Sequence, residues 1–414
     1  MRDFQQDGRS VTISQNGMCA TSHPLAAKVA VNILEAGGNA VDAGIAAAMV
    51  LNICEPQMTG LGGDCFALLQ RAPGGNPIGL NASGRAPAGL SSERLRAAGH
   101  AAIPDGGADA VTIPGAVDGF VTLSQDHGKM PLSEVLAPAI RYAEEGIPVA
   151  PRVAFDWAIA AGRLQGNARN RYLLNGKAPN AGQVFAAPEQ ANVLRKIAAE
   201  GRAGFYEGEV AADMVNTLQA VGGCHTLEDF AATKCDYVEP ISTIYKGHTL
   251  TELPPNGHGA TALLMANILG HFDLASLGPL SAERAHLEAE AAKLAYDARD
   301  RFIADPSATQ RLDHFLSPDT AASLAALIDP GKALHLPSQR LESVHKETIY
   351  LTVVDKNRMA LSLIYSVFHS FGSGIASDKF GILLQNRGAG FTLQAGHPNE
   401  AEGGKRPMHT IIPG

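Results

Sequence analysis

Two neighbouring runs of strand-forming residues near the end of the chain constrain the fold most. Residues 348–355 read TIYLTVVD, in which bulky apolar positions alternate with threonine and tyrosine at a period of two. A polar stretch, Asp355–Arg358, predicts a turn, and residues 360–367 continue with the same strand-like character. Together the two runs predict a β-hairpin whose first strand begins at Thr348.

A threonine at the head of such a strand has two interpretations. In most chains it is a strand former on a half-buried surface. In N-terminal-nucleophile enzymes it is the nucleophile, and its own α-amino group, freed by cleavage of the preceding peptide bond, takes the hydroxyl proton. Because an α-amino group titrates close to neutral pH, no His or Asp partner is needed, which suits a chain without a Ser-His-Asp signature.

The composition is that of an ordinary globular protein. Of 414 residues, 45% are hydrophobic and 18% are charged, which is enough material for a large core in one to three domains. The net charge is −8 and basic residues are not clustered, so nucleic acid or an anionic membrane is a poor partner. Residues 1–8 are polar and acidic rather than a signal peptide, and the apolar run Ala43–Cys54 is too short to span a bilayer, so a cytoplasmic location is expected.

The cysteines indicate free thiols in a reducing compartment, because they are odd in number and lack metal-ligand spacing. No metal and no organic cofactor are expected. Cys65 follows a Gly-rich loop, Gly60–Gly63, but no His motif supports it as a nucleophile. The loop lacks the Gly-Lys-Ser/Thr ending of a phosphate-binding loop, so a tight turn close to the core is preferred. The five cysteines are Cys19, Cys54, Cys65, Cys224 and Cys235.

Turn and helix signals divide the rest of the chain. A first strand is predicted at 10–14, a helix at 22–35 with Ser22 as its N-cap, and a second, fully buried helix at 40–53. A long helix is predicted at 282–300, with mixed charges on a solvated, salt-bridged face.

Residues 305–347 are polar and broken by proline and glycine, which predicts a mobile linker. The linker would end just before Thr348, where chain cleavage needs an exposed segment.

The residues around Thr348 resemble the γ-glutamyltranspeptidase family of N-terminal-nucleophile hydrolases. The resemblance covers essentially the whole chain in the family's order, and its motifs are specific in combination. The matching stretches are 348–355, Phe371–Gly374, Gly381–Leu384, Gly404–Pro407, Ala20–Ala26, Gly37–Ala43, Glu55–Pro56, Gly60–Asp64 and Pro114–Gly115.

This resemblance implies an α+β fold, a four-layer αββα sandwich with two antiparallel sheets between helical layers. It also implies that Thr348 cleaves the Glu347–Thr348 bond, giving a large-subunit region, 1–347, and the start of a small-subunit region, 348–414. The two products would form a heterodimer that acts on a small-molecule amide through an acyl-enzyme. Ser366 stands where the family places a hydroxyl that orients the nucleophile, with a plain strand serine as the alternative.

Several positions depart from the family members that act on glutathione, which hold the substrate ammonium with an asparagine and an acidic residue. Here Phe368 stands at the asparagine position and Gly390 at the acidic one, while Arg387 lies in the same loop. Arginine repels an ammonium and pairs with a carboxylate. The pocket is therefore expected to take a small or wholly anionic acyl group.

The positions that bind the substrate α-carboxylate in the family differ as well. Ser83 takes the place of an arginine by spacing, with Arg85 displaced towards the following Ala-Pro pair, and His409 and Thr410 replace a pair of serines. The chain is similar to the branch that includes oxamate amidohydrolase and glutathione-hydrolase-like proteins, which carry the same Asn-Arg-Gly loop and His-Thr pair.

The sequence stops at Gly414, whereas family members continue, with a Gly-Gly pair whose N–H groups form part of the oxyanion hole. The sandwich is therefore expected to be truncated at its C-terminal end. Three functions stay open at this point: a self-processing hydrolase of a small anionic amide, a glutathione hydrolase or γ-glutamyl transpeptidase, and an inactive fragment.

Overall fold

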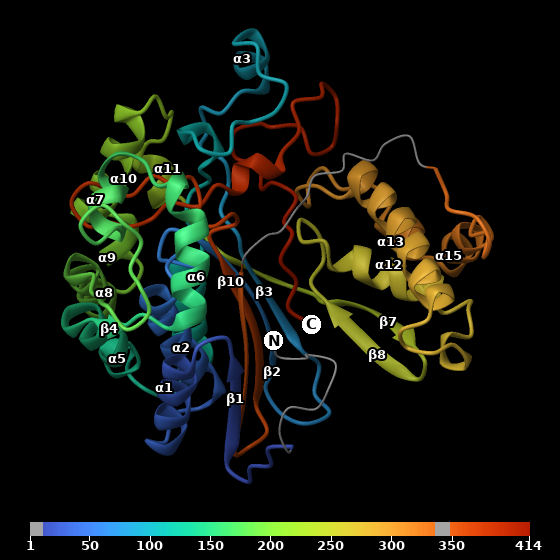
Figure 1. The fold of residues 1–414 in the computed structure, drawn as a ribbon, viewed down its shortest axis with the longest axis horizontal. Coiled ribbons are helices and arrows are strands. Elements are labelled where there is room, and N and C mark those ends of the chain that lie inside the picture. Colours follow the sequence, from blue (N-terminus) through green and yellow to red (C-terminus); the bar gives the residue numbers. More distant parts are fainter. Residues whose placement is uncertain (1–10, 336–347) are drawn as a thin grey trace.

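A six-stranded antiparallel sheet forms the centre of the computed structural model, which describes residues 11–335 and 348–414 (Figure 1). Its strand order is β1–β9–β10–β2–β3–β6, so the predicted hairpin, β9–β10, lies inside the sheet between two strands from the N-terminal part of the chain. The strands are β1 Gly17–Thr21, β2 Asp64–Gln70, β3 Ile78–Ala82, β6 Asp236–Val238, β9 Ile349–Asp355 and β10 Ala360–Ser366.

The alternation of apolar and polar residues in β9 decides which face of the hairpin is buried. Leu351 and its alternate neighbours are at most 1% exposed, whereas Tyr350, on the other face, is 41% exposed. The buried face packs on helix α2 (Ala40–Cys54), in which every residue is buried, as predicted. The approach is so close that a Cβ added to Gly44 would lie 2.4 Å from Leu361 Cδ2.

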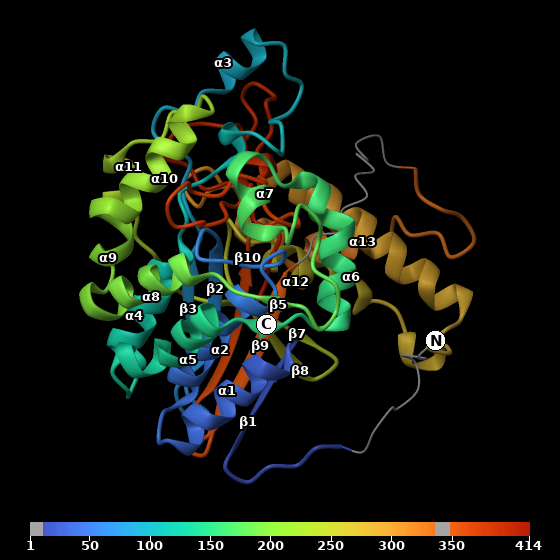
Figure 2. The ribbon, with the colours of Figure 1, turned by 60° about the vertical axis from the view of Figure 1, so that its left-hand side comes forward.

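Helices form the outer layer on this side of the sheet, as both views show (Figures 1 and 2). Short 3₁₀ turns occur at Ala108–Ala110, Ala161–Arg163, Leu274–Ser276 and Arg387–Gly390, and β4 Ile147–Pro148 pairs with β5 Val184–Phe185. The helices of this layer are α1 Pro24–Glu35, α2, α4 Ala116–His127, α5 Leu132–Glu145, α6 Pro151–Ala160, α7 Gly166–Tyr172, α8 Pro188–Glu200, α9 Ala203–Tyr206, α10 Gly208–Ala220 and α11 Leu227–Ala231. Helix α3, Ser92–Ala97, lies apart from them at the top of both views (Figures 1 and 2).

A second, smaller sheet and two helices cover part of the opposite face (Figure 1). Phe66 and Leu68 of β2 meet Leu253 in an apolar cluster between the two sheets. The order helix, sheet, sheet, helix is the predicted αββα order, and the second sheet has two strands among the described residues. These elements are β7 Ile241–Tyr245, β8 His248–Glu252, α12 Gly259–Leu269 and α13 Ala282–Phe302.

The strand predicted at 10–14 is wrong over the described part of that range. Residues 11–16 form no strand, and β1 begins only at Gly17. Val11 and Ile13 are 87% and 90% exposed, because their alternation has no partner strand to pack against. All five residues of β1 pair instead with β9, more than 300 positions away in the chain.

The following helix begins slightly later than predicted. His23, not Ser22, is its N-cap, and the His23 side chain accepts a hydrogen bond from the Leu25 N–H. Ser22 donates its hydroxyl to Glu55 Oε2 at 2.9 Å, which removes it from the capping role.

Part of the predicted linker is folded. Within residues 305–335 the chain forms α14 (Leu312–Phe315) and α15 (Pro318–Ala325). Phe315 and Ile328 are buried in an apolar cluster with side chains of α12 and α13, which holds this segment in place. Pro318 is the first residue of α15 rather than part of a loop, as its fixed φ permits. The rest of the predicted linker lies outside the described residues.

Candidate active site

Four side chains from neighbouring strands meet at one end of the main sheet. Ser366, the last residue of β10, is the cross-strand partner of Asp64, the first residue of β2. Ser83 directly follows β3 beside Asp64, and Thr348 directly precedes β9 on the other side of Ser366. Directly opposed residues in a sheet point to the same face, so this row of side chains lies on the face that looks towards the second sheet.

The two predicted hydroxyl residues are in contact. Thr348 Oγ1 donates a hydrogen bond to Ser366 Oγ at 3.0 Å. Ser366 is fully buried, and its Oγ also accepts a 2.8 Å bond from the Phe368 N–H. The serine hydroxyl therefore fixes the threonine hydroxyl at the start of the hairpin. Glu347, the other residue of the predicted cleavage site, lies outside the described residues.

Phe368 connects this hydroxyl pair to the loop that carries Arg387. Its φ is +82°, a left-handed conformation that bulky residues rarely adopt and that costs about 1–3 kcal/mol. The ring stacks on His369 at 4.3 Å between centroids, and the Cζ of Arg387 lies 3.9 Å from the same phenyl centroid. The strained backbone thus places an aromatic ring as a support for the guanidinium.

Arg387 is a fully buried cation with few partners. Its Nη1 donates to Thr410 Oγ1 at 2.9 Å, which brings two predicted pocket residues together. Its Nε and Nη2 have no hydrogen-bond partner among the described residues. Burial, opposed by the charge of Asp64, lowers the pKa of Arg387 to about 9, so the group is charged at neutral pH. A buried cation in this state is costly unless an anion pairs with it.

Asp64 is the polar centre of the site. Its Oδ1 accepts hydrogen bonds from the Gly84 N–H at 2.8 Å, the Gly115 N–H at 3.1 Å and Gln385 Nε2 at 2.9 Å. Its Oδ2 lies 3.1 Å from Nε2 of His409, and both side chains are completely buried. Burial is the main cause that lowers the pKa of His409 to about 3, so the imidazole is neutral.

Ser83 and Arg85, the other predicted pocket residues, have separate roles. Ser83 Oγ donates to Asn81 Oδ1 at 2.7 Å and accepts from Asn256 Nδ2 at 3.2 Å, so it stays in the buried polar network. Arg85 turns away and is half-exposed, with Nη1 donating to Asp305 Oδ2 at 3.4 Å. The structure therefore groups Ser83 with the site and places Arg85 in an ion pair outside it.

The Gly-rich loop is the tight turn that the sequence favoured. A Cβ added to Gly62 would lie 2.1 Å from the Leu383 carbonyl oxygen, and one added to Gly63 would lie 2.4 Å from that of Ser366. Only glycine allows this approach. The loop thereby presses the start of β2 against the end of β10, where Asp64 lies.

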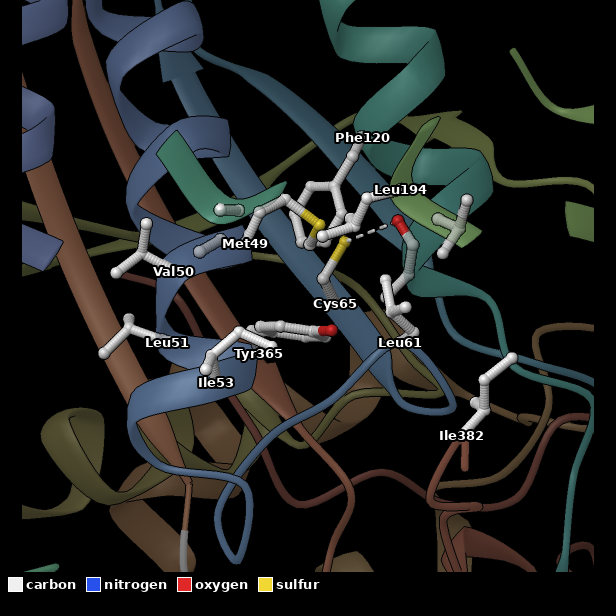
Figure 3. Packing of buried hydrophobic residues seen from close by; sticks show 14 of the residues in the cluster. Met49, Val50, Leu51, Ile53, Leu61, Cys65, Phe120, Leu194, Tyr365 and Ile382 are labelled. Carbon is white, nitrogen blue, oxygen red and sulfur yellow. Dashed lines mark hydrogen bonds between the residues drawn. The ribbon is translucent and has the colours of Figure 1, made fainter. Parts of the chain in front are cut away.

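Cys65 belongs to the core and not to the site (Figure 3). Its side chain is fully buried beside Met49, Phe120 and Tyr365, and its Sγ lies 3.9 Å from the Ala116 carbonyl oxygen. Burial raises the pKa of its thiol well above the ordinary value. A buried, protonated thiol is inert as a nucleophile.

Sequence reasoning missed two residues of the site. Asp64 stands out in the sequence only as the end of a glycine motif, and no local pattern marks Asn256. Asp64 could have been found because it is an acidic residue at the head of an apolar strand. A carboxylate at such a buried position needs hydrogen-bond partners, which indicates a polar site around it. No group of three or more metal-ligating side chains occurs within residues 11–335 and 348–414.

The sequence matches the model of a known protein family. The model, described as Gamma-glutamyltranspeptidase, covers residues 26–414. The chain belongs to this family. Two relatives in the γ-glutamyltranspeptidase family are each 35% identical to it. They are the glutathione hydrolase-like YwrD proenzyme of Bacillus subtilis, aligned over 97% of this chain and 76% of the relative, and the oxamate amidohydrolase proenzyme of Klebsiella pneumoniae, aligned over 98% and 77%.

A solved structure confirms the fold. The cephalosporin acylase from Bacillus halodurans superposes with a TM-score of 0.89 at 37% identity, over 100% of this chain and 77% of that one. The chain is thus a member of an enzyme family of amide hydrolases and acyltransferases with the N-terminal-nucleophile fold, as predicted. None of the helices within the described ranges is both long and apolar enough to cross a bilayer.

Proposed function

We propose that this protein is a self-processing amide hydrolase with Thr348 as nucleophile and with an acyl pocket for short acids that carry a free carboxylate. The observation that carries the proposal is the side-on donor pair of Arg387, Nε and Nη2, which is buried and has no partner among the described residues. This pair matches the two oxygens of a carboxylate.

Maturation would begin with the hydroxyl of Thr348. Its Oγ1 attacks the carbonyl carbon of Glu347, and the peptide bond shifts to an ester as the nitrogen takes up the hydroxyl proton. One water molecule then hydrolyses the ester. The products are the 1–347 piece with a new carboxylate and the 348–414 piece with a free α-amino group. Ser366 supports this step because its hydroxyl holds Thr348 Oγ1 at 3.0 Å.

Turnover would use the same hydroxyl with a different base. The α-amino group of Thr348 takes the Oγ1 proton as Oγ1 attacks the substrate carbonyl carbon, and the resulting ammonium gives that proton to the leaving nitrogen. Ammonia or an amine departs and an ester with Thr348 remains. Water attacks this ester, releases the acid and restores the hydroxyl.

The residues of the proposed pocket favour an acyl group that carries only a carboxylate over an acyl group that also carries an ammonium. A guanidinium repels the ammonium of a γ-glutamyl compound and attracts a carboxylate. A Cβ at Gly390 would lie 2.8 Å from the Met408 carbonyl oxygen, so this position has no room for the acidic side chain that an ammonium would need. One relative is named oxamate amidohydrolase, and oxamate is a substrate of this class.

The first test is intact mass spectrometry of the purified chain after incubation at neutral pH. We expect two fragments that meet between Glu347 and Thr348, and a single uncut chain for Thr348→Ala. Thr352→Ala is the matched control, because it removes the same kind of hydroxyl from the strand that follows Thr348, outside the site, and it should be cut like the wild type. Cleavage that persists in the Thr348→Ala variant would refute the assignment of Thr348 as the nucleophile.

The second test compares substrates on the cleaved protein. We expect ammonia release from oxamate and its longer half-amide homologues, and far less hydrolysis of the neutral methyl esters of the same compounds. Faster release of glutamate from glutathione than of ammonia from every half-amide would refute the anionic pocket and favour a glutathione hydrolase.

A further inference from the structure

The hydrogen bonds around Asp64 hold its carboxylate in place and also determine which atom carries the proton in its contact with His409. Three N–H donors converge on Oδ1, from Gly84, Gly115 and Gln385. A carboxylate can only accept hydrogen bonds, through either of its oxygens. The proton in the 3.1 Å contact between Oδ2 and His409 Nε2 therefore belongs to the imidazole.

This bond decides which nitrogen of His409 can face a ligand. A neutral imidazole carries one proton, and when Nε2 holds it, Nδ1 is a bare acceptor. Nδ1 is buried and has no hydrogen-bond partner among the described residues. An acceptor left without a donor in such a place is costly, so a ligand that supplies an N–H group would be selected.

We propose that Asp64 is a positioning residue that holds His409 as a fixed acceptor beside the cation of Arg387, so that the pocket selects anionic amides that retain an N–H over analogues that lack one. The inference rests on the proposed function and narrows its substrate class to primary and secondary amides of short dicarboxylic acids. Neither Asp64 nor the imidazole acceptor takes part in bond breaking.

Three further observations concern the acceptor and its surroundings. His409 precedes Thr410, which accepts the Nη1 bond of Arg387 at 2.9 Å, so the two groups approach from adjacent residues. Burial, and after it the charge of Arg387, lower the pKa of His409, which keeps its ring neutral and its second nitrogen free to accept. The His409 ring also packs on Phe66, 4.7 Å between centroids, which restricts its rotation.

The test compares two substrates of which only one has an N–H donor. They are the N-methyl half-amide and the methyl half-ester of the same short dicarboxylic acid. Intrinsic reactivity differs between amide and ester but cancels when the amide-to-ester ratio of kcat/KM is compared between variants. In Asp64→Asn the new amide group can donate to His409 Nε2, which moves the ring proton to Nδ1 and turns the acceptor into a donor. We expect the ratio to fall at least about tenfold.

Asp118→Asn is the matched control. Asp118 is a second buried aspartate, and it accepts a 2.7 Å bond from the Cys235 N–H away from the site. The Asp118→Asn variant should lose stability as Asp64→Asn does but keep the wild-type amide-to-ester ratio of kcat/KM. An equal fall of the ratio in both variants, or no fall in Asp64→Asn, would overturn the proposal.

A spectroscopic measurement covers the case in which Asp64→Asn does not fold. Nitrogen-15 NMR of the histidine-labelled wild type, with His409→Gln to assign the signal, should show His409 neutral with its proton on Nε2 at neutral pH. A proton on Nδ1, or a charged ring, would overturn the proposal. This readout needs no substrate, so it stands even if no anionic amide is hydrolysed, an outcome that would refute the proposed function instead.

Discussion

Replacing Arg387 with methionine should lower activity and leave stability unchanged or higher. The substitution removes the two charge-assisted hydrogen bonds that the proposed function assigns to a substrate carboxylate, each worth about 1.5–3 kcal/mol. A combined loss of about 3–6 kcal/mol corresponds to a fall of roughly 100- to 10,000-fold in kcat/KM for an anionic half-amide.

The stability of the same variant follows from the contacts of Arg387. The folded protein loses one hydrogen bond to Thr410, about 1 kcal/mol, and a cation–π contact with Phe368 of about 1–2 kcal/mol. It no longer has to hold a desolvated guanidinium, whose cost is several kcal/mol. The free energy of unfolding should therefore stay level or rise by about 1–2 kcal/mol.

The assay pairs thermal unfolding with initial rates on an anionic half-amide and on its neutral methyl ester. Arg387→Lys is the control, since it keeps the charge but not the two parallel donors, and should give an intermediate rate. The reasoning fails if Arg387→Met lowers the melting temperature and slows both substrates equally, because Arg387 would then be a structural cation.

Three further predictions concern the surroundings of the site. Ser366→Ala should slow both self-cleavage and kcat by about 10- to 100-fold at unchanged KM, because Thr348 loses its 3.0 Å partner; mass spectrometry and rates check this. Burial raises the pKa of Glu252 from 4.5 to about 8, so its carboxyl stabilises the fold fully below about pH 4.5 and this stability is lost as the pH rises towards 8. Thermal unfolding should then show Glu252→Gln equal to wild type at about pH 4 and more stable at about pH 8. Denaturant unfolding should show Gly62→Ala destabilised by about 3 kcal/mol or more, whereas Gly75→Ala, whose Cβ would be 3.4 Å from its nearest neighbour, should change by less than about 1 kcal/mol.

Much of the fold was predictable because it depends on local patterns. The period-two alternation in residues 348–355 predicts β9, and the Ala-rich, largely apolar run after Asn39 predicts α2. The strand predicted at 10–14 fails because alternation alone does not supply a partner. The partner of β9 is β1, and that pairing spans most of the chain.

The site was predictable only in part, for a similar reason. Thr348, Ser366 and Arg387 belong to motifs that can be recognised in the sequence, and the structure places them around Phe368. No local pattern shows that four donors from distant segments converge on Asp64, because this depends on how the loops meet. Burial of Phe315 against α13 is likewise a tertiary effect, which the polar composition of 305–335 hides.

The strand order has a consequence for what self-cleavage would produce. A cut before Thr348 would divide the chain but not the sheet, because β9 pairs with β1 on one side and β10 pairs with β2 on the other. The short piece would stay interleaved between two strands of the long one, with its apolar face still packed on α2. The two pieces should therefore elute together on dilution and separate only when the sheet itself is unfolded.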